Sequence, residues 1–312
     1  KCGLAGASPR NSSSATLAGV IDEYLGGEDW ETPHPDMDLE EAFGSILEDL
    51  ALLVGSLAAG RPVGKGCPAG SAEGRAGTAR RILARAPAIV NVLLNYKICA
   101  EHGLPFHPTV YYELAEAKRY RLSHPIARIE EANRLYRQAI GLARAAYRLD
   151  PGFPDAARDF GTAMPSELAS FIYSGARDKY TWRGTEPALV RRLAESVLAD
   201  GRPDVIVAAA HGSIMPALLL SEYLGSPLYF IRFSMFKRSD DSPIVSIADE
   251  AWLAAWEKGY ALLFDEDVAG GTTLSRFRDR LAPLFARART ACVIRHAGAS
   301  IRPDYMGRTW YD

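Results

Sequence analysis

The sequence lacks features that would each indicate a particular class of protein. Its four cysteines form no C-x-x-C pair and no ladder of short spacings, which excludes a disulfide scaffold and a zinc ribbon. It has no basic excess, because 36 Lys and Arg residues face 38 Asp and Glu residues at a net charge of -2, so we expect no nucleic acid partner. Its longest apolar stretch, residues 51–59, is far below the roughly 20 residues that cross a bilayer, so we expect no membrane span.

The remaining composition is typical of a folded protein in a reducing compartment. Apolar residues make up 48% and charged residues 24% of the chain, which leaves ample material for a buried interior. Residues 1–20 show no charged-then-apolar signal pattern, and the thiols show no pairing pattern, so we expect a cytoplasmic protein. With 312 residues, the chain is long enough for one large domain or two smaller ones.

Three regions of the chain differ in their pattern. Residues 1–37 mix Gly, Ser, Pro and acidic residues with little apolar periodicity, and we expect a loosely ordered arm there. Residues 38–190 carry amphipathic patterns broken by proline and glycine, which favour a helical domain. In residues 191–312 short apolar runs alternate with helical patterns, which predicts an α/β domain with a parallel sheet. The expected strands of that sheet are residues 204–210, 228–233, 260–264 and 290–295.

The segment ALLFDEDVAGGTTL, residues 261–274, carries the most chemical information. An apolar strand delivers Asp265 and Glu266 at its carboxyl end, and a Gly/Thr turn follows and opens a helix. Glycines let successive backbone amides turn toward one point, hydroxyls add donors, and a helix N-terminus adds partial positive charge, so this turn is suited to a phosphate. A sugar phosphate with Mg²⁺ would bridge the acids and the turn. The alternative is a capped helix that follows two solvated acids.

This segment resembles the signature with which type I phosphoribosyltransferases bind phosphoribosyl pyrophosphate (PRPP), and the resemblance covers roughly residues 195–312. It implies a phosphoribosyltransferase-like parallel sheet in which Asp265 and Glu266 contact the ribose hydroxyls and help to hold Mg²⁺. It also implies that residues 269–273 bind the 5′-phosphate. The implied substrate-binding stretch is Asp267, Val268, Ala269, Gly270, Gly271, Thr272 and Thr273.

One position departs from the purine-type members of that family. Those members usually place an Asp in the phosphate loop as the base that takes a ring proton, and Ala269 stands there in this chain. Either Asp267 substitutes from a displaced position, or the acceptor needs no such base. We therefore do not assign hypoxanthine or guanine as the acceptor.

Two further segments resemble parts of the family's pyrophosphate site. After the first predicted strand comes a turn at the family's pyrophosphate-binding position, where His211 replaces the commoner Arg or Lys; its residues are Ala210, His211, Gly212 and Ser213. The alternative for His211 is a loop histidine without a ligand. The polar segment 234–246 corresponds to a mobile loop, in which Lys237 and Arg238 would reach the pyrophosphate. The alternative there is a solvated hairpin.

The C-terminal stretch RPDYMGRTW, residues 302–310, resembles a segment of the acceptor pocket in purine-type members. Tyr305 and Trp310 would then stack on a flat acceptor. The alternative is that these aromatic side chains pack onto the core, as aromatic residues near a terminus often do.

Together these features favour a Mg²⁺-dependent phosphoribosyltransferase, a glycosyltransferase of the pentosyl type. It would transfer the 5-phosphoribosyl group from PRPP to an acceptor and release pyrophosphate, with Asp265, Glu266, Lys237 and Arg238 as catalytic residues. The acceptor would be a nucleobase or the amine or hydroxyl of a specialised metabolite. The helical region would cap the acceptor side or form a homodimer contact. The alternatives are a PRPP-sensing binding protein without transfer activity and an enzyme acting on another phosphosugar.

Overall fold

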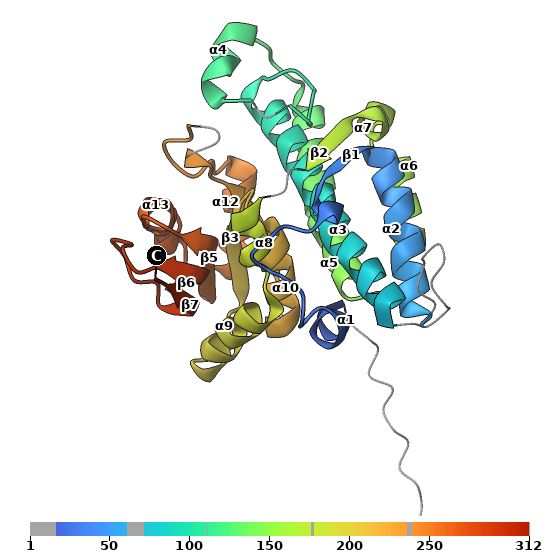
Figure 1. Cartoon of the computed structure of the whole chain (residues 1–312). Coiled ribbons are helices and arrows are strands. Elements are labelled where there is room, and N and C mark those ends of the chain that lie inside the picture. Colours follow the sequence, from blue (N-terminus) through green and yellow to red (C-terminus); the bar gives the residue numbers. More distant parts are fainter. Residues whose placement is uncertain (1–16, 61–71, 111, 176–177, 236–238, 312) are drawn as a thin grey trace, which may run out of the picture.

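A computed structural model of the chain describes residues 17–60, 72–110, 112–175, 178–235 and 239–311 (Figure 1). In these ranges a mostly helical part, drawn in blue and green, lies beside a sheet drawn in yellow, orange and red. The expected class, a parallel-sheet C-terminal domain preceded by a largely helical region, is confirmed.

The helical part is built around the long buried helix α3 and the amphipathic helix α5, which packs on it. Its elements are α1 (Leu17–Tyr24), the 3-10 helix η1 (Pro35–Met37), β1 (Leu39–Ala42), α2 (Phe43–Ala58), α3 (Ala72–His102), the 3-10 helix η2 (Leu114–Glu116), α4 (Ala117–Tyr120), α5 (Ile126–Tyr147), α6 (Phe153–Ala163), α7 (Ser166–Ser170), β2 (Ile172–Gly175), α8 (Lys179–Arg183) and α9 (Pro187–Ala199). Strands β1 and β2 pair antiparallel. Helix α3 is long and apolar enough to cross a membrane, but 94% of its apolar window is buried inside the molecule, which is typical of a core helix.

Residues 17–37 do not form the loose arm that the composition predicts. The ring of Trp30 stacks on that of Trp182 in α8 with 4.3 Å between centroids. The indole nitrogen of Trp30 donates to the Leu25 carbonyl, and that of Trp182 donates to the Asp29 carbonyl at 2.9 Å. Buried aromatic surface and satisfied indole donors anchor this segment, although its composition is largely polar. Residues 1–16 of the predicted arm lie outside the described ranges.

The sheet has five parallel strands in the order β4-β3-β5-β6-β7. Its strands and helices are β3 (Val205–Ala210), α10 (Ile214–Leu224), β4 (Leu228–Arg232), α12 (Ile247–Leu253), the 3-10 helix η3 (Ala254–Trp256), β5 (Tyr260–Val268), α13 (Thr272–Leu281), the 3-10 helix η4 (Ala282–Leu284), β6 (Arg287–His296) and β7 (Tyr305–Trp310). Every residue of β3 and β4 is buried, which explains their unbroken apolar runs. The four predicted strands are present, and β7 is an additional fifth.

The strand order reverses between β3 and β5. From β3 the chain continues to β4 on one side, whereas from β5 it continues through β6 to β7 on the other side. In open α/β sheets, ligands bind beyond the carboxyl ends of the strands where the order reverses in this way. The turn after β3 and the acids and turn at the end of β5 therefore flank the expected ligand position.

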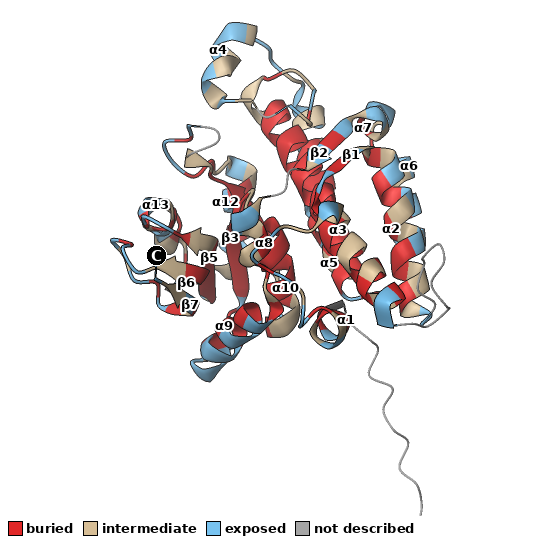
Figure 2. Ribbon diagram, in the orientation of Figure 1, coloured by how far each residue is buried: buried red, intermediate tan, exposed pale blue. Residues whose placement is uncertain are grey.

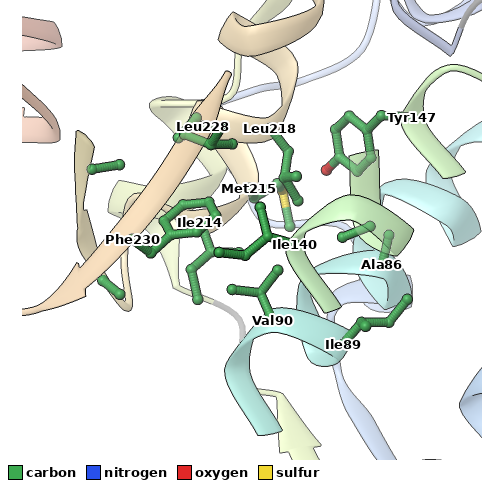
Figure 3. Packing of buried hydrophobic residues seen from close by; sticks show 14 of the residues in the cluster. Ala86, Ile89, Val90, Ile140, Tyr147, Ile214, Met215, Leu218, Leu228 and Phe230 are labelled. Atoms are coloured by element: carbon green, nitrogen blue, oxygen red, sulfur yellow. The ribbon is translucent and has the colours of Figure 1, made fainter. Parts of the chain in front are cut away.

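The two parts of the described chain share one hydrophobic core. The larger cluster of buried residues runs from α3 and α5 to α10 and β4 and includes Val90, Ile140, Ile214 and Phe230 (Figure 3). The Tyr136 hydroxyl also donates to the Phe230 carbonyl at 2.7 Å. Buried residues, red in Figure 2, accordingly continue from α3 through α10 to β3. Packing is thus continuous across the predicted domain boundary at residues 190–191.

Candidate functional site

The two acids of β5 and the turn after β3 meet at a single point. The Ser213 hydroxyl donates to Asp265 Oδ1 at 3.2 Å and to Glu266 Oε2 at 2.5 Å. The backbone of Gly212 approaches Glu266 closely, because a Cβ at Gly212 would lie 1.9 Å from Glu266 Oε1. The structure therefore brings the predicted ribose acids and the predicted pyrophosphate turn together.

Burial dominates the electrostatics of the acids. It raises the pKa of Asp265 to about 6, and burial together with the neighbouring Asp265 charge raises the pKa of Glu266 well above its usual range. In the described part of the chain, no Lys, Arg or His side chain forms an ion pair with either carboxyl group. A buried carboxylate without a cationic partner is unfavourable, so this site gains from a ligand that brings positive charge or hydroxyl donors.

The turn after β5 leaves its backbone amides available. Gly271 has a φ of 93°, a conformation that favours glycine, and α13 begins at the next residue. Ser300 donates two hydrogen bonds to the Gly270 carbonyl, from its backbone nitrogen at 3.0 Å and from its hydroxyl at 2.7 Å. These bonds fix the backbone of the turn. Among the described residues, no protein acceptor takes the amide hydrogens of residues 270–273. These amides and the start of a ten-residue helix suit an anion.

The remaining residues of the predicted signature differ in position. Val268 is buried in a small cluster with Leu274 and Cys292, so its side chain supports the turn and does not face a ligand. The Thr273 hydroxyl lies 3.7 Å from the sulfur of Met235, at the start of the segment 234–246. Ala269 precedes the two glycines of the turn and is exposed.

The predicted pyrophosphate turn follows β3 directly. Ala210 is buried, and its peptide bond to the partly buried His211 is cis. The Thr181 hydroxyl of α8 donates to the Gly212 carbonyl at 3.3 Å. His211 thus lies between the end of β3 and the start of α10, one residue before Gly212, whose backbone approaches Glu266.

The predicted pyrophosphate-contacting residues Lys237 and Arg238 lie outside the described ranges. The described residues on either side of them, Met235 and Asp241, contact α13. Besides the contact of Met235, Arg276 in α13 donates to the Asp241 carbonyl at 2.9 Å. Asp240 is buried and accepts hydrogen bonds from Arg232 at the end of β4.

Helix α8 is a part of the site that sequence reasoning missed. A Cβ at Gly184, which follows this helix, would lie 3.2 Å from Glu266 Cβ, so the chain here packs directly on the acid. Asp178 caps α8 by accepting from the amides of Tyr180 and Thr181. An Asp before a short helix was the available signal, but nothing in the sequence indicates that this helix lies on β5.

The two C-terminal aromatic residues lie at opposite ends of β7. Trp310 is at the carboxyl end, where the guanidinium groups of Arg183 and Arg308 lie 4.1 Å and 4.8 Å from its ring centroid. Tyr305 is the first residue of β7, at the amino ends of the strands, and its hydroxyl donates to Asp200 at 2.9 Å. The predicted acceptor contact of Tyr305 is therefore wrong, because a parallel strand places its first residue away from the ligand edge. Trp310 reaches that edge, but two cations already lie over its ring.

Mg²⁺ fits this site only together with a ligand. Carboxylate oxygens are suitable donors, and Asp265 and Glu266 provide them without an ion pair to any described cationic side chain. However, the described residues contain no group of three His, Cys, Asp or Glu side chains that could hold a metal ion alone. The remaining donors would come from water and a phosphosugar, as is common for this ion.

No protein-family model and no curated protein matches the sequence. Several phosphoribosyltransferases are among the solved structures that are similar to about two fifths of this chain. A purine phosphoribosyltransferase from Pyrococcus horikoshii shares 23% identity, with 42% of this chain and 87% of that chain covered and a TM-score of 0.33. A hypoxanthine phosphoribosyltransferase from Staphylococcus aureus shares 18%, with 40% and 74% covered and a TM-score of 0.33.

A hypothetical protein from Neisseria gonorrhoeae with bound ppGpp is similar to the same extent. It shares 18% identity, with 40% of this chain and 78% of that chain covered and a TM-score of 0.34. At these identities and TM-scores, no conclusion about activity or acceptor follows from the similarity.

Proposed function

We propose that the protein is a Mg²⁺-dependent phosphoribosyltransferase that transfers the 5-phosphoribosyl group of PRPP to an acceptor and releases pyrophosphate. One observation carries this proposal. Asp265 and Glu266 both hydrogen-bond to Ser213, and they lie beside a turn whose backbone amides donate to no described protein group. The site thus combines acceptors for sugar hydroxyls with donors for phosphate.

Each part of the site has a role in this reaction. The carboxylates accept hydrogen bonds from the ribose hydroxyls, and residues 269–273 bind the 5′-phosphate. His211 and Gly212 face the pyrophosphate from the end of β3. Asp265 and Glu266, together with the bound phosphosugar, would hold Mg²⁺, which would supply positive charge to stabilise the departing pyrophosphate.

The transfer exchanges one bond at the anomeric carbon for another. An electron pair of the acceptor forms the new bond while the carbon–oxygen bond to pyrophosphate breaks, and pyrophosphate leaves with that electron pair. An acceptor that attacks through N–H or O–H releases that proton to water. Positive charge grows on the ribose ring in the transition state, where the buried carboxylates beside it are stabilising.

Calorimetric titration with PRPP and Mg²⁺ tests the binding part of the proposal. We expect the wild-type protein to bind and the double variant Asp265→Asn, Glu266→Gln to bind about tenfold or more weakly, because hydrogen bonds to charged groups are lost. Asp279→Asn, at an exposed acid on α13, is the matched control and should bind normally. Equal affinity of all three proteins would contradict the proposal.

A PRPP-sensing protein without transfer activity is the second candidate. It is favoured by Ala269, a methyl group where purine-type members carry their base. Pyrophosphate release during incubation with PRPP, Mg²⁺ and a panel of nucleobases, aromatic acids, amines and alcohols separates the two, since a sensor binds PRPP and releases none. Titration with ribose 5-phosphate in parallel detects an enzyme for another phosphosugar.

A further inference from the structure

Arg183, the last residue of α8, lies at the carboxyl edge of the sheet. The next residue, Gly184, packs on β5, because a Cβ there would lie 3.2 Å from Glu266 Cβ. The Arg183 guanidinium lies 4.1 Å from the ring centroid of Trp310, the last residue of β7. Burial raises the pKa of Asp267 on β5, and cationic charge that includes Arg183 opposes that shift. This guanidinium therefore lies beside the proposed PRPP site, near the ends of β5 and β7.

In the proposed reaction, this is the side from which the acceptor approaches. The pyrophosphate lies at the turn after β3, which is the neighbour of β5 on one side, whereas β6 and β7 lie on the other side. A nucleophile attacks the anomeric carbon from the side opposite the leaving group. Arg183 therefore brings a positive charge from the helical part to the acceptor side. Arg308 of β7 adds a second guanidinium there, 4.8 Å from the ring centroid of Trp310.

The protein uses the donors of Arg183 only in part. Its Nη2 lies 2.7 Å from Glu31 Oε2, and within the described ranges its buried Nε donates to no acceptor. Asp267 pairs instead with His296, at 3.1 Å. A guanidinium binds a carboxylate best through two parallel N–H···O bonds, one from each of two nitrogens. A ligand carboxylate, which is not tied to the chain as Glu31 is, is free to take both.

Glu31 is a partner that a ligand can replace. Its side chain is 48% exposed, whereas that of Arg183 is 13% exposed, and among the described residues Arg183 is the only ion-pair partner of this carboxylate. An ion pair with a half-exposed partner contributes little stability. The stacking of Trp30 on Trp182 already holds this segment against α8, so a purely structural role explains the pair poorly.

We propose that Arg183 binds a carboxylate group of the acceptor in the place that Glu31 takes in this structure. The acceptor is then an organic acid. A neutral acceptor leaves the Glu31 pair intact and gains no charged hydrogen bond from Arg183, so it is discriminated against. This inference rests on the proposed phosphoribosyl transfer and specifies its acceptor class.

The experiment compares the wild-type protein with Arg183→Gln, Arg183→Lys, Glu31→Gln and the control Arg158→Gln, at an exposed residue of α6. The probes are para-aminobenzoate, para-hydroxybenzoate and an imidazole carboxylate, each beside its carboxamide, which has a similar shape without the charge. Pyrophosphate release with PRPP and Mg²⁺ gives kcat/KM for each acid and amide. The ratio of the two is the readout, because a change in PRPP binding affects both alike. Ligand-observed NMR measures binding of the same probes to the protein with PRPP and Mg²⁺.

We expect the wild-type protein to prefer the acid over its amide about tenfold or more, the effect of a hydrogen bond to a charged group. Arg183→Gln should remove most of this preference, and Arg183→Lys, which keeps the charge without the planar fork, should keep part of it. Glu31→Gln should increase the preference, because it removes the competing carboxylate. Arg158→Gln should match the wild type, and melting temperatures of all variants establish that they are folded.

Three results would overturn the inference. They are equal use of acid and amide by the wild-type protein, a preference for the acid that persists in Arg183→Gln, and no binding of any acid by a wild-type protein that binds PRPP. Preferential binding of the acids without pyrophosphate release would support the role of Arg183 and refute the transfer. Absence of PRPP binding by the wild-type protein would refute the proposed function itself.

Discussion

Asp265 shows at the scale of one residue that folding and ligand binding make opposite demands. Burial raises its pKa to about 6, so the folded protein holds this proton more tightly than the unfolded chain does. The stability that this group contributes is therefore present below its ordinary pKa of 3.8 and is lost as the pH rises through about 6. At neutral pH the ionised side chain opposes folding, whereas the proposed ribose contact requires it.

Asp265→Asn should accordingly stabilise the ligand-free protein at pH 7 relative to the wild type, and do so less at pH 4.5, because asparagine has no charge to bury. Chemical unfolding at the two pH values in the presence of a chelator measures this difference. An equal effect at both pH values would show that the Asp265 charge does not limit stability. The same variant should bind PRPP more weakly, since it lacks the carboxylate.

Gly212→Ala tests the close approach of the turn to Glu266. The added Cβ would lie 1.9 Å from Glu266 Oε1, so the acid or the turn must move. We expect a loss of about 1–3 kcal/mol in the free energy of unfolding, as for other overpacked sites, and weaker PRPP binding. Gly298→Ala is the control, because nothing lies within 4 Å of its added Cβ. Denaturant titration and calorimetry should separate the two variants, and similar behaviour of both would contradict the described packing.

Among the secondary-structure elements, the buried strands could be predicted from the sequence, whereas contacts between segments far apart in the sequence could not. The apolar runs of β3 and β4 identify them because all their residues are buried, and the acids and glycines after β5 identify the site through local chemistry. Strand β7 was missed because only Tyr305 and Gly307 among its residues are buried, so it has no apolar run. The position of α8 over Glu266 depends on a contact between distant segments, which no local pattern encodes.

The stacking of Trp30 on Trp182 makes the N-terminal segment a support for α8. Trp30→Ala should lower the free energy of unfolding by about 3–5 kcal/mol, as truncation of a buried Trp does, and speed hydrogen exchange of the α8 amides. Trp30→Phe keeps an aromatic ring there and should be milder. Hydrogen exchange with mass spectrometry gives the readout, and unchanged exchange in α8 after Trp30→Ala would refute the supporting role.

At the scale of the whole molecule, the helical part and the sheet depend on each other. The apolar contacts of α5 with β4 join them, and so does Lys97 of α3, which pairs with Asp249 of α12 at 2.9 Å where both side chains are buried. Separation would expose this apolar surface and leave Asp249 without its cation. The sequence could not predict this interdependence, because a change of pattern near residue 190 looks like a domain boundary whether or not the core continues across it.

Residues 191–312 expressed alone should therefore not form the native sheet. We expect a poorly soluble or loosely packed product with little dispersion in its amide NMR spectrum and no PRPP binding. The full chain under the same conditions is the control. A well-dispersed spectrum of the fragment would show that the sheet domain folds independently and that the shared core is dispensable.

The two hydrogen bonds from Ser300 to the Gly270 carbonyl affect how the turn binds an anion. A loop whose carbonyl groups are already hydrogen-bonded is preorganised. The entropy lost by the chain when phosphate binds is therefore small, and the binding free energy is reduced little. Inorganic sulfate, which offers the same tetrahedron of oxygens, should therefore settle at residues 270–273 in crystals of the ligand-free protein, with the backbone there unmoved.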